Sequence, residues 1–127
     1  MMRGIRGAIT VSADLPDEIL KETRNLVMEM VGKNEIEADN VASVIISTTA
    51  DISSAFPAKA VRTLEGWTYV PVMCKHEMGV PGSLPLCIRV MMHVNTDQKQ
   101  ENIQHIYMNE AVKLRPDLVK SSQVNKQ

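Results

Sequence analysis

The alternation of apolar and polar side chains predicts two strands that carry the main features of the chain. Residues 3–12 alternate with a period of two, and one face of this strand is small and polar except for Arg6. Residues 86–94 form the strongest predicted strand, with a wholly apolar face and an opposite face that carries Arg89. If the two strands are registered alike, both arginines lie on one side of a sheet. Because an unpaired guanidinium away from water is very costly, this arrangement predicts an anionic ligand.

Two helices are predicted between these strands. Residues 15–31 follow the helical period, with Asp14 as the expected N-cap and Gly32 as the expected stop. A second, shorter helix is expected within residues 51–66, where Pro57 suits the first helical position. The helices would cover the apolar face of the 86–94 strand.

Three further strands complete the expected sheet. Residues 41–48 are β-branched and apolar, residues 67–74 return to strand, and the last strand lies within residues 103–108. The order of elements predicts one α/β domain over residues 1–127, with a mixed sheet and helices on one face. The polar tail from about Arg115 is expected to be mobile.

Composition narrows the possible functions. A formal net charge of −1 gives no reason to expect a nucleic acid or an acidic membrane as partner, and 3% aromatic residues offer few platforms for stacking bases. No apolar run is long enough to span a bilayer, and the opening residues lack the apolar stretch of a signal peptide. Cys74 and Cys87 make no disulfide framework, so we expect a cytoplasmic protein with reduced thiols.

The usual catalytic constellations are weak in this sequence. It has no G-x-S-x-G motif, no P-loop and no dinucleotide-binding glycine fingerprint. Cys74, His76 and Cys87 could in principle bind zinc, but their spacing fits no standard pattern and a fourth ligand is not evident. A Cys74–His76 nucleophile pair rests mainly on closeness in sequence.

Cations on well-structured elements are the more distinctive feature. Lys59 and Arg62 lie three residues apart and would share one face of the second helix. Each could simply belong to a solvated face or a salt bridge. Arg89 differs, because its neighbours in sequence are almost all apolar. A guanidinium fixed in such a strand favours recognition of a small molecule that carries several negative charges.

Five segments share a pattern that runs from Met2 to about Leu118. They are residues 3–8 (RGIRGA), 56–62 (FPAKAVR), 66–72 (GWTYVPV, followed by Glu77 and Met78), 87–92 (CIRVMM) and 114–117 (LRPD). Together and in this order, they resemble the AroH-type chorismate mutases. The resemblance implies a pseudo-α/β-barrel that assembles as a homotrimer, with active sites in clefts between neighbouring subunits.

The resemblance also implies a reaction and its requirements. The reaction is the rearrangement of chorismate to prephenate, a step toward phenylalanine and tyrosine. It is intramolecular and needs no proton transfer, so neither a cofactor nor a metal is expected. Four residues would act most directly. Arg89 would hydrogen-bond the ether oxygen and a carboxylate, Arg6 and Tyr107 would each bind a carboxylate, and Glu77 would accept from the substrate hydroxyl.

The remaining expected site residues would line the cleft. By resemblance, the surroundings of Cys74 would lie beside the hydroxyl-bearing ring, and Leu114 with Arg115 would close over the substrate. Met73 stands where relatives commonly carry a small hydroxyl residue, which puts a side-chain contact there in doubt. The adjoining subunit would contribute Phe56, Lys59 and Arg62.

Two alternatives remain open from the sequence. A trimeric enamine or imine deaminase has a similar barrel and also uses a strand arginine to hold a carboxylate, but it predicts no equivalents of Glu77 and Arg6. A ligand-binding module without catalytic activity would bind chorismate and not convert it.

Overall fold

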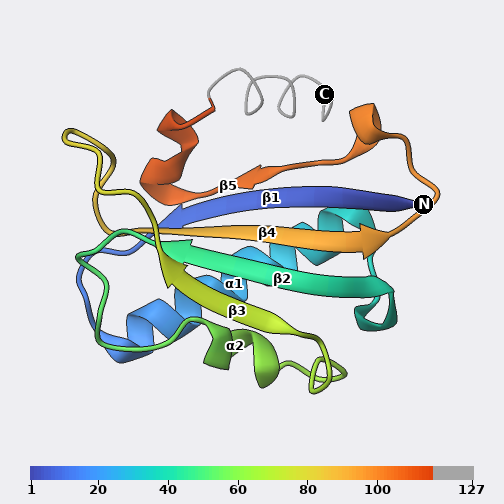
Figure 1. Ribbon diagram of the computed structural model, residues 1–127, viewed down its shortest axis with the longest axis horizontal. Helices are drawn as coiled ribbons and strands as arrows, with labels where there is room; N and C mark the ends of the chain where they lie inside the picture. The colour runs from blue at the N-terminus through green and yellow to red at the C-terminus, as the bar shows by residue number, and fades with distance from the viewer. Residues whose placement is uncertain (116–127) are drawn as a thin grey trace.

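A five-stranded mixed sheet forms the body of the molecule (Figure 1). The computed structural model describes residues 1–115, so most of the predicted mobile tail lies outside the described residues. The strands are β1 (Met2–Thr10), β2 (Val41–Thr48), β3 (Val72–His76), β4 (Cys87–Asn95) and β5 (Ile106–Tyr107). Their order is β3-β2-β4-β1-β5, with β4 antiparallel to both neighbours and the two outer pairs parallel. The predicted mixed sheet is confirmed.

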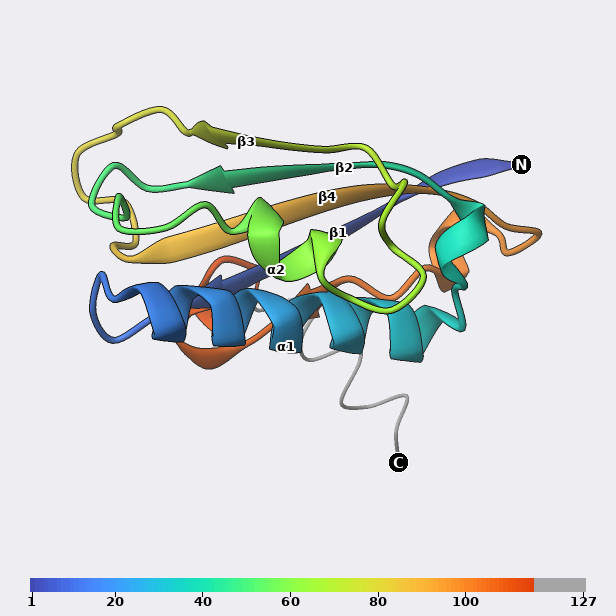
Figure 2. The same ribbon diagram turned by 90° about the horizontal axis from the view of Figure 1, so that it is seen from below.

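Two helices cover one face of this sheet and leave the other face open (Figure 2). The long helix α1 (Pro16–Asn34) lies beneath the sheet, and the short helix α2 (Ala58–Arg62) lies on the same side, next to α1. Short 3-10 turns occupy Ala38–Asn40, Gln100–Asn102 and Asn109–Lys113. Neither helix of the described chain has the length and apolar character that a membrane crossing requires.

The ends of α1 differ from the prediction because neighbouring groups decide them. Its N-cap is Leu15, without a side-chain cap, whereas the carboxylate of Asp14 accepts hydrogen bonds from the backbone of Ser53 and Ser54 across the fold. Gly32 does not stop the helix. The helix ends at Glu35, whose φ of 53° is left-handed and whose N–H donates to the carbonyl of Gly32.

The second helix and the third strand are both shorter than predicted. The chain is helical only over Ala58–Arg62, and residues 49–57 form a loop that Asp14 holds. After α2, consecutive tight turns carry the chain through Gly66, at a φ of 85°, before β3 begins at Val72. The final strand is likewise reduced from the predicted 103–108 to two paired residues.

The β1–β4 register sets which side chains enter the core. Ile5 and Ile9 on β1, and Ile88, Val90 and Met92 on β4, are almost fully buried between the sheet and the helices. Directly opposed residues of an antiparallel pair project from the same face, so the pairing of Arg6 with Met91 and of Ala8 with Arg89 directs both arginines to the open face. The expected common register is confirmed.

The contact between β1 and α1 is close at Gly7. A Cβ atom built there would lie 2.5 Å from the sulfur of Met30 and 3.1 Å from Cδ1 of Leu26, and both of these side chains are fully buried. Gly32, near the end of α1, has no atom within 4 Å of the corresponding position. The two glycines therefore have opposite packing requirements.

We predict opposite changes in stability for alanine at these positions. Gly7→Ala should lower the free energy of unfolding by about 1–3 kcal/mol, because Met30 and Leu26 must shift. Gly32→Ala should raise it by about 0.5–1 kcal/mol, because alanine favours the helix. Urea titrations at one fixed protein concentration measure both, and a neutral Gly7→Ala variant would contradict the close contact.

Candidate active site

A small pocket on the open face brings together three of the predicted cations. It has a volume of about 140 Å³ and is lined by Arg6, Gly7, Ala8, Arg89, Tyr107, Leu114 and Arg115. Strands β1 and β4 supply the first two arginines, and β5 places Tyr107 beside Ala8 through its parallel pairing. The turn Asn109–Lys113 then returns the chain so that Leu114 and Arg115 reach the same pocket.

Arg6 and Tyr107 are held against each other. Nε of Arg6 donates a hydrogen bond to the phenol oxygen of Tyr107 at 3.0 Å. The phenol accepts this bond, so its own proton can be donated to a ligand in the pocket. Both side chains are half-buried, which strengthens such a contact relative to one in bulk water.

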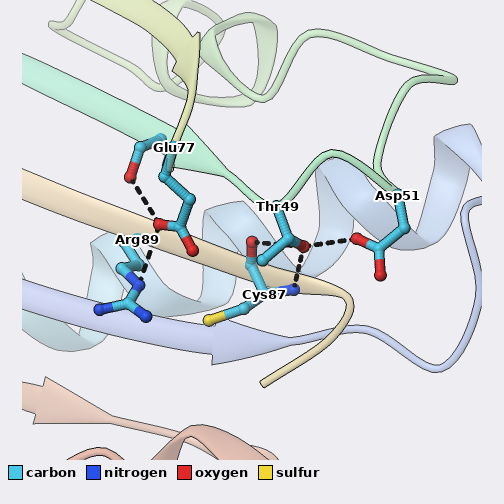
Figure 3. A network of polar contacts seen from close by, with 6 residues as sticks. Thr49, Asp51, Glu77, Cys87 and Arg89 are labelled. Carbon is cyan, nitrogen blue, oxygen red and sulfur yellow. Dashed lines mark hydrogen bonds and ion pairs between the residues drawn. The ribbon is translucent and has the colours of Figure 1, made fainter. Parts of the chain in front are cut away.

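Arg89 forms an ion pair with Glu77 (Figure 3). Its Nε lies 3.0 Å from Oε2 of Glu77, and the two side chains are 40% and 17% exposed. This Nε is buried, and within residues 1–115 no acceptor is aligned with it as a hydrogen bond requires. The contact with Glu77 is therefore mainly electrostatic. Because the Arg89 side chain as a whole is 40% exposed and borders the pocket, its terminal N–H groups can still donate to a ligand.

A hydrogen-bonded corner that sequence reasoning missed fixes the start of β4 (Figure 3). Thr49 and Cys87 exchange hydrogen bonds, with the Thr49 N–H donating to the Cys87 carbonyl at 3.1 Å and the Cys87 N–H donating to Oγ1 of Thr49 at 3.0 Å. The carboxylate of Asp51 accepts from the Thr49 hydroxyl and from the N–H of Leu86. The T-x-D pattern just after a strand was the available signal.

The other predicted residues lie away from the arginine pocket within one subunit. A second cavity of about 380 Å³ lies between the loop before α2 and β3, and Phe56 and Cys74 help to line it. Phe56 is 75% exposed and Met73 65% exposed, and Lys59 and Arg62 are exposed on α2. The structure thus separates the predicted site into two groups of residues.

Cys74 belongs to the helix-covered side of the sheet. Its sulfur accepts a hydrogen bond from the backbone N–H of Ala58 at 3.2 Å, and it is in register with Ile46, a core residue. Burial raises the pKa of the Cys74 thiol, so at neutral pH it is a poor nucleophile. Its side chain therefore does not face Arg89 of the same chain. That the backbone around Cys74 lies beside the hydroxyl-bearing ring stays a prediction.

The zinc and nucleophile alternatives find no geometric support. Cys87 packs with Ala8 on the opposite side of the sheet from Cys74, so the two thiols diverge. Nε2 of His76 lies 3.0 Å from the carbonyl oxygen of Ile52. Within the part of the chain that the structure describes, no group of three or more His, Cys, Asp or Glu side chains could hold a metal ion.

His105 supports Arg6 through the backbone, a role that sequence reasoning did not find. Its Nδ1 accepts a hydrogen bond from the Arg6 N–H at 2.9 Å, immediately before the β1–β5 pairing begins. Burial, followed by the charges of Arg6 and Arg115, lowers the pKa of His105 below its ordinary value of 6.5. A proton on Nδ1 would remove the acceptor, so the folded chain favours the neutral ring.

We predict that His105 makes the fold sensitive to acid. The unfolded chain protonates this histidine first, so stability is fully present above about pH 6.5 and falls as the pH drops toward the lower folded-state pKa. In His105→Asn, an amide oxygen can still accept from Arg6 without titrating. Urea unfolding at pH 7.5 and pH 5.0 should show a smaller loss for this variant than for the wild type. Equal losses would contradict the prediction.

Comparisons with known proteins show the family to which this chain belongs. The family model for chorismate mutase type I matches residues 2–118. Chorismate mutase AroH of Bacillus subtilis (strain 168) is 50% identical over 118 residues, which are 93% of this chain and 93% of that protein. Chorismate mutase AroH of Thermus thermophilus is 49% identical over 119 residues, 93% and 97% of the two chains.

A solved structure supports the same relationship. The chorismate mutase from Clostridium thermocellum has a TM-score of 0.83 and 51% identity, and the match covers 86% of this chain and 96% of that one. The fold and the sequence agree over most of both chains, and the chain belongs to the type I chorismate mutases.

Family membership settles two of the expectations from the sequence. The resemblance to AroH-type chorismate mutases is confirmed, and so is the expected enzyme class, an isomerase. A role in aromatic amino acid biosynthesis follows from that activity. The deaminase alternative is not supported by these matches.

Proposed function

We propose that the chain converts chorismate to prephenate as a homotrimer in the cytoplasm, with Arg89, Arg6, Tyr107 and Glu77 as the principal site residues. The observation that carries this proposal is the convergence of two strand arginines on one pocket of the open sheet face. The substrate is a dicarboxylate, and two guanidiniums with a phenol match that charge.

The reaction needs positioning and charge stabilisation more than a nucleophile or a group that transfers protons. One C–O bond breaks while a C–C bond forms within the same molecule, and no proton moves. Holding the two ends of a flexible dianion together removes much of the entropy cost of the reactive conformer. Fixed donors then stabilise the negative charge that grows on the ether oxygen as its bond lengthens.

Arg89 and Glu77 would act on opposite charges of the transition state. The terminal N–H groups of Arg89, which borders the pocket, would donate to the ether oxygen. The two contacts recorded for Glu77 both reach Oε2, which makes Oε1 available to the substrate hydroxyl. The carboxylate would also balance positive charge that develops on the ring.

Arg6 and Tyr107 would bind substrate carboxylates. Tyr107 accepts from Arg6, so the pair presents a guanidinium and a phenolic O–H to one anion. Leu114 and Arg115 border the same pocket and would cover the bound substrate. No step of this mechanism requires a cofactor or a metal.

Three features support a site shared between subunits. The arginine pocket, at about 140 Å³, is smaller than the 300–1,000 Å³ typical of pockets for small molecules. Phe56, Lys59, Arg62 and Met73 lie elsewhere on the same subunit and would complete the pocket of a neighbour. Apolar groups on the open sheet face, such as Ile45, would be buried between copies.

The direct test is an assay with chorismate. Purified protein should consume chorismate and form prephenate above the uncatalysed rate, followed by absorbance and product analysis. Binding of chorismate without turnover would instead favour the ligand-binding module that the sequence left open.

We predict that the charge of Arg89 matters more for turnover than for binding. Replacing Arg89 with citrulline, a neutral isostere, should lower kcat by about 10²–10³-fold with a much smaller loss of substrate binding. Arg89→Lys should also lower kcat, because a point charge cannot reproduce the guanidinium fork. Steady-state kinetics and ligand titration separate the two effects. Equal losses of kcat and affinity would mean that Arg89 serves only to bind.

We predict that a charge on the open sheet face separates the subunits. Ile45, 38% exposed between β3 and β4, should be buried in the trimer, so Ile45→Lys would place an unpaired cation there at a cost of several kcal/mol. Sedimentation should show monomers of 14.1 kDa in place of trimers, with chorismate turnover largely lost.

A matched control uses an exposed apolar residue on the helical side. Met28→Lys on α1 should stay trimeric and active, because Met28 is already 53% exposed and lies on the side away from the open face. Circular dichroism checks that both variants remain folded. Full activity in a monomeric Ile45→Lys variant would contradict the shared site.

A further inference from the structure

We propose that Ser47 is a positioning residue that prevents Glu77 from closing onto Arg89. The proposal rests on the roles proposed above for Glu77 and Arg89. Ser47 has no place in the site as predicted from the sequence, and in the described chain its hydroxyl is hydrogen-bonded to Glu77.

Ser47 lies between the strands that supply the two charged residues. On the open face of β2 it is in register with Arg89 on β4 and with Lys75 on β3, and Glu77 follows β3 directly. Its hydroxyl donates to Oε2 of Glu77 at 3.3 Å. The backbone N–H of Glu77 donates to the carbonyl of Thr48 at 2.9 Å, which fixes where this side chain starts.

The Ser47 hydroxyl and Nε of Arg89 both approach one carboxylate oxygen of Glu77. Nε of Arg89 lies 3.0 Å from the same Oε2, but without hydrogen-bond alignment. An arginine and a carboxylate at this distance normally prefer two parallel, aligned hydrogen bonds. The pair in this structure stops short of that geometry, and the hydroxyl of Ser47 is the donor that holds Oε2 in its present position.

Loss of this hydroxyl would change what the two charged groups can do. Glu77 could then rotate into an aligned, two-point pair with Arg89, which would occupy a terminal N–H group that the ether oxygen needs. It would also move Oε1 away from the substrate hydroxyl. Ser47 thus keeps a strong ion pair incomplete, so that both partners remain available to the substrate.

Another serine on the same strand provides an internal control. Ser43 lies four residues earlier on the same face of β2, is half-buried like Ser47, and contacts Nδ1 of His93 at 3.1 Å. It therefore shares the strand, the face and the hydroxyl with Ser47, but not the contact with Glu77.

The first experiment compares the kinetics of serine variants in the full-length protein. Ser47→Ala should lower kcat by roughly 3- to 10-fold, the size expected for one hydrogen bond of ordinary strength, with a smaller change in KM. Ser47→Thr should keep most of the activity, because it retains the hydroxyl and suits a strand. Ser47→Cys, a weak donor of similar size, should resemble Ser47→Ala. Ser43→Ala should match the wild type. A normal kcat in both Ser47→Ala and Ser47→Cys would overturn the proposal.

The second experiment asks whether Ser47 acts through Glu77. Ser47→Ala is combined with Glu77→Gln, because a neutral amide cannot form the charged pair with Arg89. The serine substitution should then have little further effect on kcat. If it lowers kcat by the same factor in both backgrounds, Ser47 acts independently and the proposal is wrong. If Glu77→Gln alone leaves kcat unchanged, the proposed role of Glu77 fails instead, and the role of Ser47 fails with it.

Discussion

The antiparallel pairing of β1 with β4 is the constraint on which the rest of the structure depends. Its register opposes Ala8 to Arg89 and Arg6 to Met91, so one face of two adjacent strands is apolar and the other is cationic. A slip of β1 by one residue past β4 would reverse the faces of β1 and turn Arg6 toward α1, while Arg89 stayed on the open face. The burial of the isoleucines and the position of the arginine pocket thus both follow from the hydrogen bonds between β1 and β4. Packing of the core therefore also fixes where the two arginines lie.

The sequence predicted the parts of the fold that follow from side-chain period. The faces of β1 and β4 and the body of α1 could be read from alternation and helical spacing, because burial acts on those patterns directly. The ends of elements could not. Asp14 is a standard capping residue, yet its carboxylate contacts Ser53 and Ser54, almost forty positions away. Long-range partners of this kind leave no local signal.

The same distinction holds at the candidate site. Arg6 and Arg89 stood out because a cation among apolar strand residues conflicts with its surroundings. Ser47 and His105 did not stand out, because each is an ordinary strand or loop residue whose importance comes from one contact across the sheet. The proposed division of the site between two subunits came from the resemblance alone, since no period or spacing in one chain describes a contact with a second copy.

At Gly7, which has no side chain, the wall of the arginine pocket consists of main chain alone. Its backbone lines the pocket on one side, while the space that its missing side chain leaves is filled by Met30 from the other. At this point only the main chain therefore separates the arginine pocket from the apolar core. A substitution in the core next to Gly7, even one that preserves volume, would shift this main chain and so change the shape of the arginine pocket, because no side chain lies between them. Engineering of thermal tolerance in this enzyme should therefore begin elsewhere on α1.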